Sequence, residues 1–250
     1  MENLTILPNE LLLLITSLLN IGSTFSLSRA CKSLLTMTQK KCKVLIDIDI
    51  HTILIDIICN NDTKLFKWLV PDVNLLQSKH TDEYYYHVTI SGNLDILKYL
   101  HENECPRKMR GDVSSCRNAV RYGHLEMLKY LHENGCFWDS NSIACDAAIH
   151  GHLEVLQYLR ENGCHWNEWS SIFAATNGHL EVLKYLHKNG CNWTGNNWDE
   201  YICTNVAKKG YLEVLKYLHE NGCYWDIKAC VEAAQDSDRP NILKYLHEEN

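Results

Sequence analysis

The chain contains few residues that interrupt helices. Only 4 of its 250 residues are proline and 12 are glycine. Proline removes a backbone donor and clashes with the preceding turn, and glycine weakens a helix interior, so their scarcity leaves long stretches where helices can form. Hydrophobic residues make up 46% of the chain and charged residues 22%, a composition that excludes a mainly disordered protein. We therefore expect a folded, mostly helical chain.

The chain also lacks an excess of positive charge and a long hydrophobic run. Its 24 lysines and arginines against 31 aspartates and glutamates give a formal net charge of −7. Binding to a phosphate backbone requires a basic face, so we expect no nucleic-acid partner. The longest purely apolar run near the N-terminus, Leu11 to Ile15, is too short for a membrane span or a signal sequence. We therefore expect no membrane partner, an intracellular location and reduced thiols for the 12 cysteines.

A 14-residue segment, GHLEMLKYLHENGC at residues 123–136, recurs along the chain. Its opening glycine, or Asn61 in the same place, stands 27 to 32 residues from the next. The full and looser copies occupy residues 64–69, 92–105, 123–136, 151–164, 178–191, 210–223 and 242–248. Self-similarity at such a period is the mark of a repeat protein. The sequence therefore predicts seven units, of which the first and last are degenerate.

Each unit contains two predicted helices. In the repeated segment, Leu125, Leu128 and Leu131 form an apolar face at helical spacing, and Asn134–Gly135 ends the helix because glycine accepts a left-handed conformation. The first helix lies about ten residues earlier and carries pairs of small residues. These pairs are Ala147–Ala148, Ala174–Ala175, Val206–Ala207 and Ala233–Ala234. Because one helix pair cannot bury its apolar stripe alone, the pattern predicts an all-α solenoid in which stacked pairs share a core.

The repeated units resemble ankyrin repeats. The family pattern A-A-x-x-G-H-x-E-V-V-x-x-L-L-x-x-G-A is matched by residues 147–164 and 174–191, and the likeness extends roughly over residues 46–250. Cysteine occupies the small, buried alanine position of the pattern at Cys136, Cys164, Cys191 and Cys223. The amino-acid sequence of the repeated segment is similar to that of the ankyrin families of amoeba-infecting giant DNA viruses and some protists. This resemblance implies a location in the host cytoplasm. The resemblance implies a protein-binding array without a cofactor.

The units depart from the ankyrin pattern in their connections. Several are shorter than the usual 33 residues, and the T-P-L-H turn is absent. We therefore expect short loops in place of β-hairpins. A tryptophan follows two residues after each repeat cysteine, and we expect it to pack over the helix ends; these are Trp138, Trp166, Trp193 and Trp225. We also expect hydrogen bonds between neighbouring units from His124, His152 and His179.

Residues 4–41 do not fit the repeat and resemble an F-box. The family patterns L-P-x-E-L-L-x-x-I-x-x-x-L and L-S-x-V-C-K-x-L are matched from Leu7 and from Leu27, with Ala30 in place of the valine. The resemblance implies a small helical domain, 1–41, ahead of the repeat array, 42–250. It also implies that an apolar face of this domain binds the Skp-type linker subunit of a cullin-RING (SCF-type) ubiquitin ligase. That face would contain Leu7, Pro8, Leu11, Ile15, Leu18, Leu27 and Cys31. The alternative is a segment that only caps the end of the solenoid.

Catalytic and metal-binding interpretations are less favoured. Histidine and cysteine stand four residues apart in several units, a spacing that suits two metal ligands on a helix. These pairs are His101/Cys105, His132/Cys136, His187/Cys191 and His219/Cys223. Arg160 replaces the histidine in one unit, however, and the same pair simply recurs without converging ligands. Cysteines of successive units are expected about 10 Å apart, the spacing of packed helices, which is beyond disulfide reach. No nucleophile elbow, phosphate loop or metalloprotease motif is present, so we expect neither a metal site nor an enzyme.

The units differ from one another most in their first helices. By the resemblance, these positions line the concave surface that ankyrin arrays use for recognition. The candidate contact residues are Arg117, Asn118, Arg121, Tyr122, Asp146, His150, Phe173, Asn177, Asn205, Lys208 and Lys209. The sequence thus predicts a monomeric protein–protein interaction module that recruits a bound protein to a ubiquitin ligase. The alternative is an ankyrin scaffold with no link to a ligase.

Overall fold

The computed structural model describes residues 50–70, 81–103, 113–191, 193 and 199–248. These residues contain fourteen α-helices and no strand. The chain divides into two compact units, unit 1 (residues 1–107) and unit 2 (residues 108–250), each of which is described by itself. The predicted boundary between residues 41 and 42 lies outside the described residues.

The helices follow one another as pairs. Unit 1 contains α3 (Ile50–Cys59), α4 (Thr63–Leu69), α5 (Thr81–Ser91) and α6 (Leu94–Glu102). Unit 2 contains α7 (Val113–Arg121), α8 (Leu125–Glu133), α9 (Ser140–His150), α10 (Leu153–Glu161), α11 (Glu168–Thr176), α12 (Leu180–Lys188), α13 (Asp199–Lys209), α14 (Leu212–Glu220), α15 (Ile227–Asp236) and α16 (Pro240–Glu248). Short loops join α8 to α9, α10 to α11 and α14 to α15, as expected from the missing turn motif. The predicted all-α solenoid of helix pairs is confirmed.

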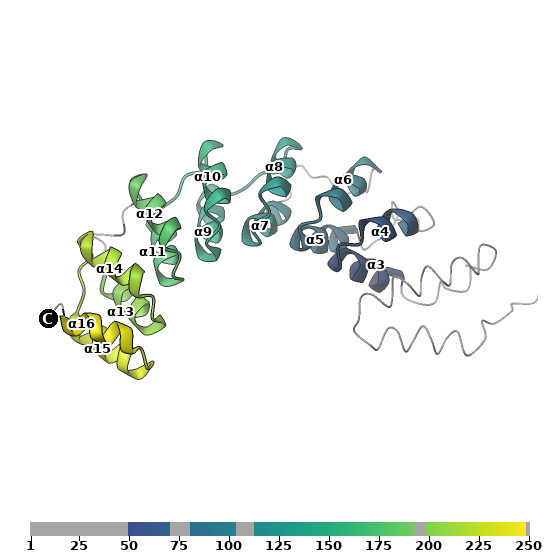
Figure 1. Ribbon diagram of the computed structural model, residues 1–250. Helices are drawn as coiled ribbons and strands as arrows, with labels where there is room; N and C mark the ends of the chain where they lie inside the picture. The colour runs from purple at the N-terminus through teal and green to yellow at the C-terminus, as the bar shows by residue number, and fades with distance from the viewer. Residues whose placement is uncertain (1–49, 71–80, 104–112, 192, 194–198, 249–250) are drawn as a thin grey trace, which may run out of the picture. The chain divides into compact units, whose positions relative to one another are not determined.

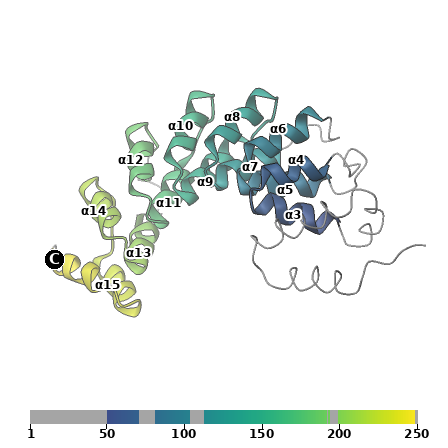
Figure 2. The same ribbon diagram turned by 45° about the vertical axis from the view of Figure 1, so that its right-hand side comes forward.

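Unit 2 is a curved stack with its first helices on the inner side. In Figures 1 and 2, α7, α9, α11 and α13 lie inside the curve, and α8, α10, α12 and α14 lie outside it. Neighbouring first helices also contact one another more extensively than neighbouring second helices do. The alanine pairs explain this, since Ala147, Ala148 and Ala174 are fully buried and their small side chains let helix backbones approach closely. The inner helices of unit 2 therefore pack more closely together than the outer helices do. Each helix pair is thus narrower on the inner side of the curve, like a wedge.

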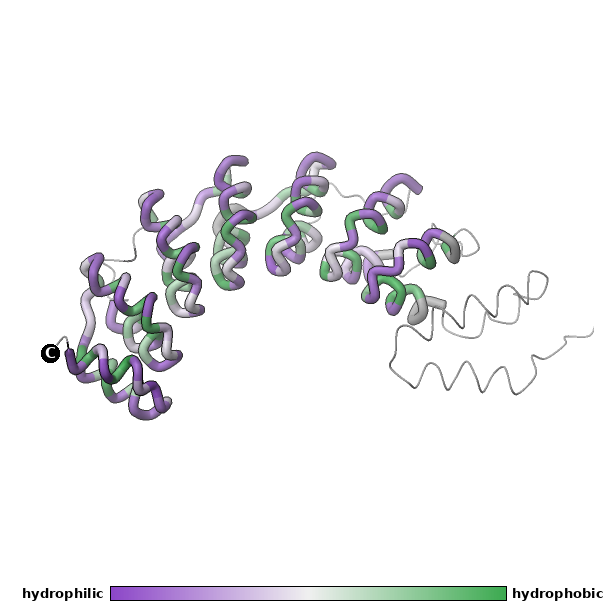
Figure 3. Tube along the Cα trace, viewed as in Figure 1, coloured by the Kyte–Doolittle hydropathy of each residue, from purple (hydrophilic) through white to green (hydrophobic). Residues whose placement is uncertain are grey.

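The core is continuous along the stack. On α10, Val155, Leu156 and Leu159 are buried, and the same three positions are buried on α8, α12 and α14. Figure 3 shows hydrophobic residues gathered in the middle of the helix pairs and hydrophilic residues in the outer turns. Each pair thus buries its apolar stripe against its neighbours, as the helical spacing of leucines predicts.

A residue with positive φ follows the first helix of each described unit. Five of these residues are glycines, and Asn61 (φ 56°) and Asp238 (φ 52°) take the same place in the first and last units. Gly151 shows why the position is demanding. Its φ is 77°, and a Cβ atom there would lie 2.4 Å from Nδ1 of His179 in the next unit. Glycine is therefore required both by backbone conformation and by close approach of a neighbouring side chain.

Histidines at the start of the second helices connect neighbouring units. Nε2 of His152 lies 2.9 Å from the carbonyl oxygen of Arg121, and Nε2 of His179 lies 2.9 Å from that of Ile149. A carbonyl oxygen only accepts, so Nε2 carries the proton in both bonds. The predicted bridges are confirmed for these two histidines. Arg239 has the same role in the last unit, where its Nε donates to the Lys208 carbonyl at 3.1 Å.

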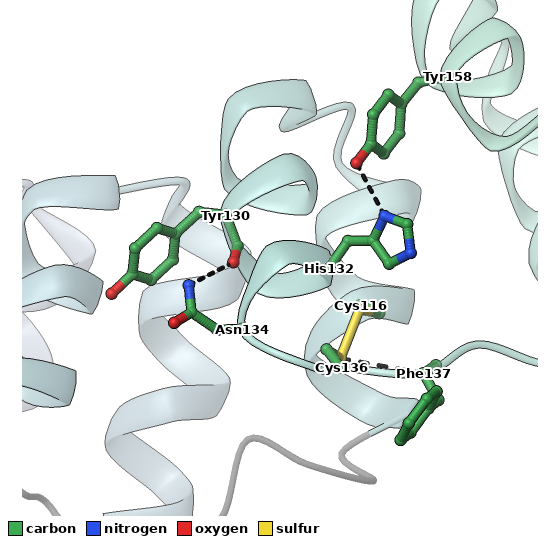
Figure 4. The surroundings of a disulfide bond; sticks show 7 residues. All are labelled: Cys116, Tyr130, His132, Asn134, Cys136, Phe137 and Tyr158. Atoms are coloured by element: carbon green, nitrogen blue, oxygen red, sulfur yellow. Dashed lines mark hydrogen bonds between the residues drawn. A yellow bond between two sulfur atoms is a disulfide. The ribbon is translucent and has the colours of Figure 1, made fainter. Parts of the chain in front are cut away.

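A second set of contacts joins the outer helices. His132, His187 and His219 are each hydrogen-bonded through Nδ1 to a tyrosine hydroxyl of the next unit at 2.9 Å (Figure 4 shows the first). Each histidine ring also contacts the tryptophan that follows its helix, with ring centroids 4.1 to 4.4 Å apart. Where Arg160 replaces histidine, its guanidinium lies 4.5 Å from the centroid of the Trp166 ring. The tryptophans therefore pack at the ends of the second helices, as predicted.

Removal of one hydroxyl from this set tests its contribution. Tyr217→Phe should lower the free energy of unfolding by about 0.5–1.5 kcal/mol, because the variant loses a hydrogen bond to His187. Tyr185→Phe is the matched control: it changes the same position of α12, where the hydroxyl has no hydrogen-bond partner among the described residues. Urea denaturation followed by far-UV circular dichroism measures both. Equal losses in the two variants would contradict a contribution from the bond.

One prediction about the cysteines is wrong. Cys116 on α7 and Cys136 after α8 are both buried and form a disulfide (Figure 4). The spacing of about 10 Å applies to cysteines at equivalent positions of successive units, whereas these two lie within one unit. Cys203 and Cys223 occupy the corresponding places in a later unit with their sulfur atoms 3.3 Å apart, and both are free thiols. Hydrogen bonding to Cys223, and then burial, raise the pKa of Cys203, which keeps this thiol protonated.

Candidate functional site

The first helices of unit 2 expose one side to solvent on the inner side of the curve. On α7, Cys116, Ala119 and Val120 are buried, so the helical period leaves Arg117 and Arg121 on the opposite side. We use "inner face" for the exposed side of α7, α9, α11 and α13, which carries Arg117, Asn118, Arg121, Tyr122, Ile149, His150, Trp169, Phe173, Asn177, Tyr201, Asn205, Lys208 and Lys209.

The predicted contact residues differ in exposure. Arg121, Tyr122, His150, Lys208 and Lys209 are exposed. A second group, Arg117, Asn118, Phe173, Asn177 and Asn205, is half-buried. Asp146 differs from all of these, because it is only 3% exposed.

Asp146 is buried beneath two arginines. Its Oδ2 accepts a hydrogen bond from Nε of Arg117, and its Oδ1 accepts one from Nε of Arg121 at 3.0 Å. The arginine side chains remain 41% and 44% exposed. A buried carboxylate is costly unless it is paired and hydrogen-bonded, and the two guanidinium groups satisfy both conditions. Asp146 therefore sits under the inner face and fixes the orientation of Arg117 and Arg121, which lie one turn apart on α7.

Aromatic side chains occupy the middle of the inner face. On α11, the rings of Trp169 and Phe173 lie 5.8 Å apart, and both side chains are half-buried. On α13, Tyr201 is 51% exposed. Sequence reasoning did not assign Trp169 or Tyr201 to the site. The available signal was the spacing of four residues that puts Trp169 with Phe173, and Tyr201 with Asn205, on one side of a helix.

A lysine lies at the far end of the inner face. Lys209 Nζ donates to the carbonyl oxygen of Thr176 at 2.6 Å and contacts Oδ1 of Asn177 at 3.4 Å. The structure thus brings two groups of predicted residues together, Asn177 with Lys209 and Asp146 with its two arginines. Asn205, in contrast, binds the backbone of its own helix, since its Nδ2 donates to the Tyr201 carbonyl at 2.8 Å.

His150 adds no charge to this surface at neutral pH. Partial burial lowers its pKa below the ordinary 6.5, and the neighbouring His152 and Arg121 lower it further. The imidazole is therefore neutral at pH 7. The positive charge of the inner face comes from its arginines and lysines.

The described residues contain no group of three or more histidine, cysteine, aspartate or glutamate side chains arranged to hold a metal ion. None of the described helices is long and apolar enough to cross a membrane. The candidate ligase-binding residues, Leu7, Pro8, Leu11, Ile15, Leu18, Leu27 and Cys31, lie outside the described residues.

Known proteins support the identity of the repeats. The sequence model of the ankyrin-repeat family matches residues 144–187 and 172–219, so this part of the chain is similar to ankyrin repeats. Among 178 matching chains of solved structures is the ankyrin repeat domain of human ASB11, with a TM-score of 0.55 and 20% sequence identity over 68% of this chain and 84% of that chain. This likeness shows the fold. No curated protein matches the chain.

Proposed function

We propose that these ankyrin repeats bind a protein partner through the inner face of unit 2. Ankyrin repeats indicate a protein–protein interaction module. The observation that carries the proposal is the surface itself, an aromatic middle flanked by cationic ends. Aromatic residues and arginine dominate the energetics of protein interfaces. Tyr122 and Tyr201, each 51% exposed, add large amphipathic side chains to that surface.

The size of the inner face suits a protein partner. Packed helices lie about 10 Å apart, so the four helices from α7 to α13 span about 30 Å. A standard interface buries about 800 Å² on each side, so a partner of standard size would contact most of this length. The rigid helical frame also presents the side chains without a large loss of conformational entropy on binding.

The proposal extends to a specific role, that of an adaptor for a ubiquitin ligase. Residues 4–41 resemble an F-box, and by that resemblance they dock to the Skp-type subunit of a cullin-RING (SCF-type) ligase. The inner face then holds the protein to be modified. If the likeness to giant-virus ankyrin proteins reflects origin, that protein belongs to the host cytoplasm.

One capture experiment tests both the inner face and the F-box-like segment. The full chain is used as bait in an extract of its native host, and bound proteins are quantified by mass spectrometry. Tyr201→Ala with Lys208→Ala should reduce capture of the partner at least tenfold and leave the Skp-type subunit bound, because both residues are exposed on the inner face. Leu11→Asp should have the reverse effect. The matched control, Glu181→Ala with Lys184→Ala, removes an exposed ion pair from the outer helix α12 and should change neither.

The outcomes separate the two parts of the proposal. If the wild-type chain never captures the Skp-type subunit, the adaptor role fails and the chain is a scaffold whose N-terminal segment acts as a cap. In that case removal of residues 1–41 should destabilise the array. If the variant with Tyr201→Ala and Lys208→Ala captures every partner of the wild type, the inner face is not the binding surface.

A further inference from the structure

We propose that Arg117 and Arg121, held by Asp146, form a clamp for a side-chain carboxylate of an acidic segment in the protein partner. This inference rests on the proposed function of the inner face and specifies the chemistry of what binds there. The clamp is defined by these three residues.

Both arginines of the clamp keep hydrogen-bond donors that Asp146 does not use. Asp146 uses both carboxylate oxygens on the two Nε atoms. The Nη groups of both arginines have no partner among the described residues. An arginine presents several donors in a planar fork, and this fork matches a carboxylate or a phosphate in two parallel hydrogen bonds. Asp146 therefore fixes the Nε side of each guanidinium group, and the Nη donors of both groups remain available to a ligand.

The clamp is ordered before a ligand binds. Two cations one turn apart on a helix repel each other, and long side chains lose conformational entropy when a ligand orders them. The buried carboxylate offsets the repulsion and orders both side chains before a ligand arrives. A site that is ordered in advance binds more tightly for the same contacts.

The net charge of the clamp suits a single carboxylate. Two guanidinium groups and one carboxylate give the clamp a net charge of +1. His150, the titratable neighbour on α9, is neutral at pH 7 because burial and Arg121 lower its pKa. A single carboxylate neutralises the clamp, whereas a phosphate dianion would leave an excess of negative charge over a buried aspartate. The charge balance thus favours a carboxylate over a phosphate.

The surroundings fit a peptide segment rather than a free ion. Tyr122, 51% exposed, stands beside Arg121 with its ring stacked against His124 at a centroid distance of 6.2 Å. The Trp169–Phe173 pair lies two first helices further along, about 20 Å away at the usual helix spacing. An extended chain covers that distance in about six residues. The favoured occupant is therefore a segment with an acidic residue and an apolar residue about six residues apart.

Fluorescence anisotropy with an acidic probe tests the clamp on the full chain. The probe is a fluorescein-labelled octaglutamate peptide at low ionic strength. The net charge of −7 opposes non-specific attraction of this probe, so binding reports a local cationic site. Arg117→Gln and Arg121→Gln, made singly so that Asp146 keeps one partner, should each weaken binding at least tenfold. The matched control Lys184→Gln removes an exposed cation from the outer helix α12 and should leave binding within twofold.

Further variants and probes distinguish the carboxylate clamp from a site that needs only positive charge and from a phosphate site. Arg121→Lys keeps the charge but loses the fork, and it should also weaken binding at least fivefold; full binding by this variant would overturn the clamp. Tighter binding of a phosphoserine peptide than of octaglutamate would overturn the choice of a carboxylate. Circular dichroism and urea denaturation establish that each variant is folded. If Arg117→Gln still captures every natural partner that the variant with Tyr201→Ala and Lys208→Ala loses, the clamp is wrong while the proposed function stands.

Discussion

Replacement of Leu156 by alanine should lower the free energy of unfolding by about 2–5 kcal/mol, the range for loss of a buried leucine side chain. Leu156 is fully buried in α10, in the middle of unit 2. The substitution removes apolar contacts and leaves a cavity that rigid helices cannot close. The measurement is urea denaturation of the full chain, followed by far-UV circular dichroism.

Leu153→Ala is the control for this prediction. Leu153 begins the same helix but is only half-buried, so its replacement should cost clearly less. In a repeat protein each unit contacts only its neighbours, so a cavity in α10 should also weaken the coupling between units on either side of it. A broader unfolding transition for Leu156→Ala than for Leu153→Ala is expected. Equal effects of the two substitutions would show that the described burial of Leu156 is wrong.

Gly151→Ala should destabilise the protein by about 1.5–3.5 kcal/mol. An L-residue in the left-handed region costs about 1–2 kcal/mol. The new Cβ would also lie 2.4 Å from Nδ1 of His179, so the ring must move and its hydrogen bond to the Ile149 carbonyl is lost. That bond contributes about 0.5–1.5 kcal/mol more. Thermal or urea denaturation measures the total.

Gly163→Ala separates the two causes. Gly163 has a similar φ of 80°, but a Cβ atom there would meet nothing within 4 Å. This variant should therefore show only the conformational cost of about 1–2 kcal/mol. A double-mutant cycle with His179→Ala isolates the clash, since Gly151→Ala should cost less when the ring is already absent. Equal destabilisation by Gly151→Ala and Gly163→Ala would contradict a cost from the close approach of His179.

The architecture was predictable because it repeats. Buried leucines recur at helical spacing, and the phase of the repeat placed Asn61 at a glycine position, where the structure gives it a φ of 56°. The packing of the tryptophans and the bridges from His152 and His179 followed from the same regularity. A pattern seen several times constrains local structure more strongly than any single segment can.

Features that depend on one contact between particular helices were not predictable. Asp146 stands 29 residues from Arg117 and 25 from Arg121, and nothing in the sequence distinguishes this buried carboxylate from a solvent-exposed one. The Cys116–Cys136 disulfide depends on which side of α7 faces the loop after α8. The F-box-like segment stays a prediction.

The wedge shape of each helix pair has a consequence for how such a chain changes over generations. Every pair adds its own length and its own small bend, and successive first helices pack against one another at each joint of unit 2. Duplication or deletion of a whole unit of 27 to 32 residues would therefore extend or shorten the arc by one step while leaving the remaining joints intact. The length of the inner face would thus change in whole units, which suits partners of different size and leaves the core of the remaining units unchanged.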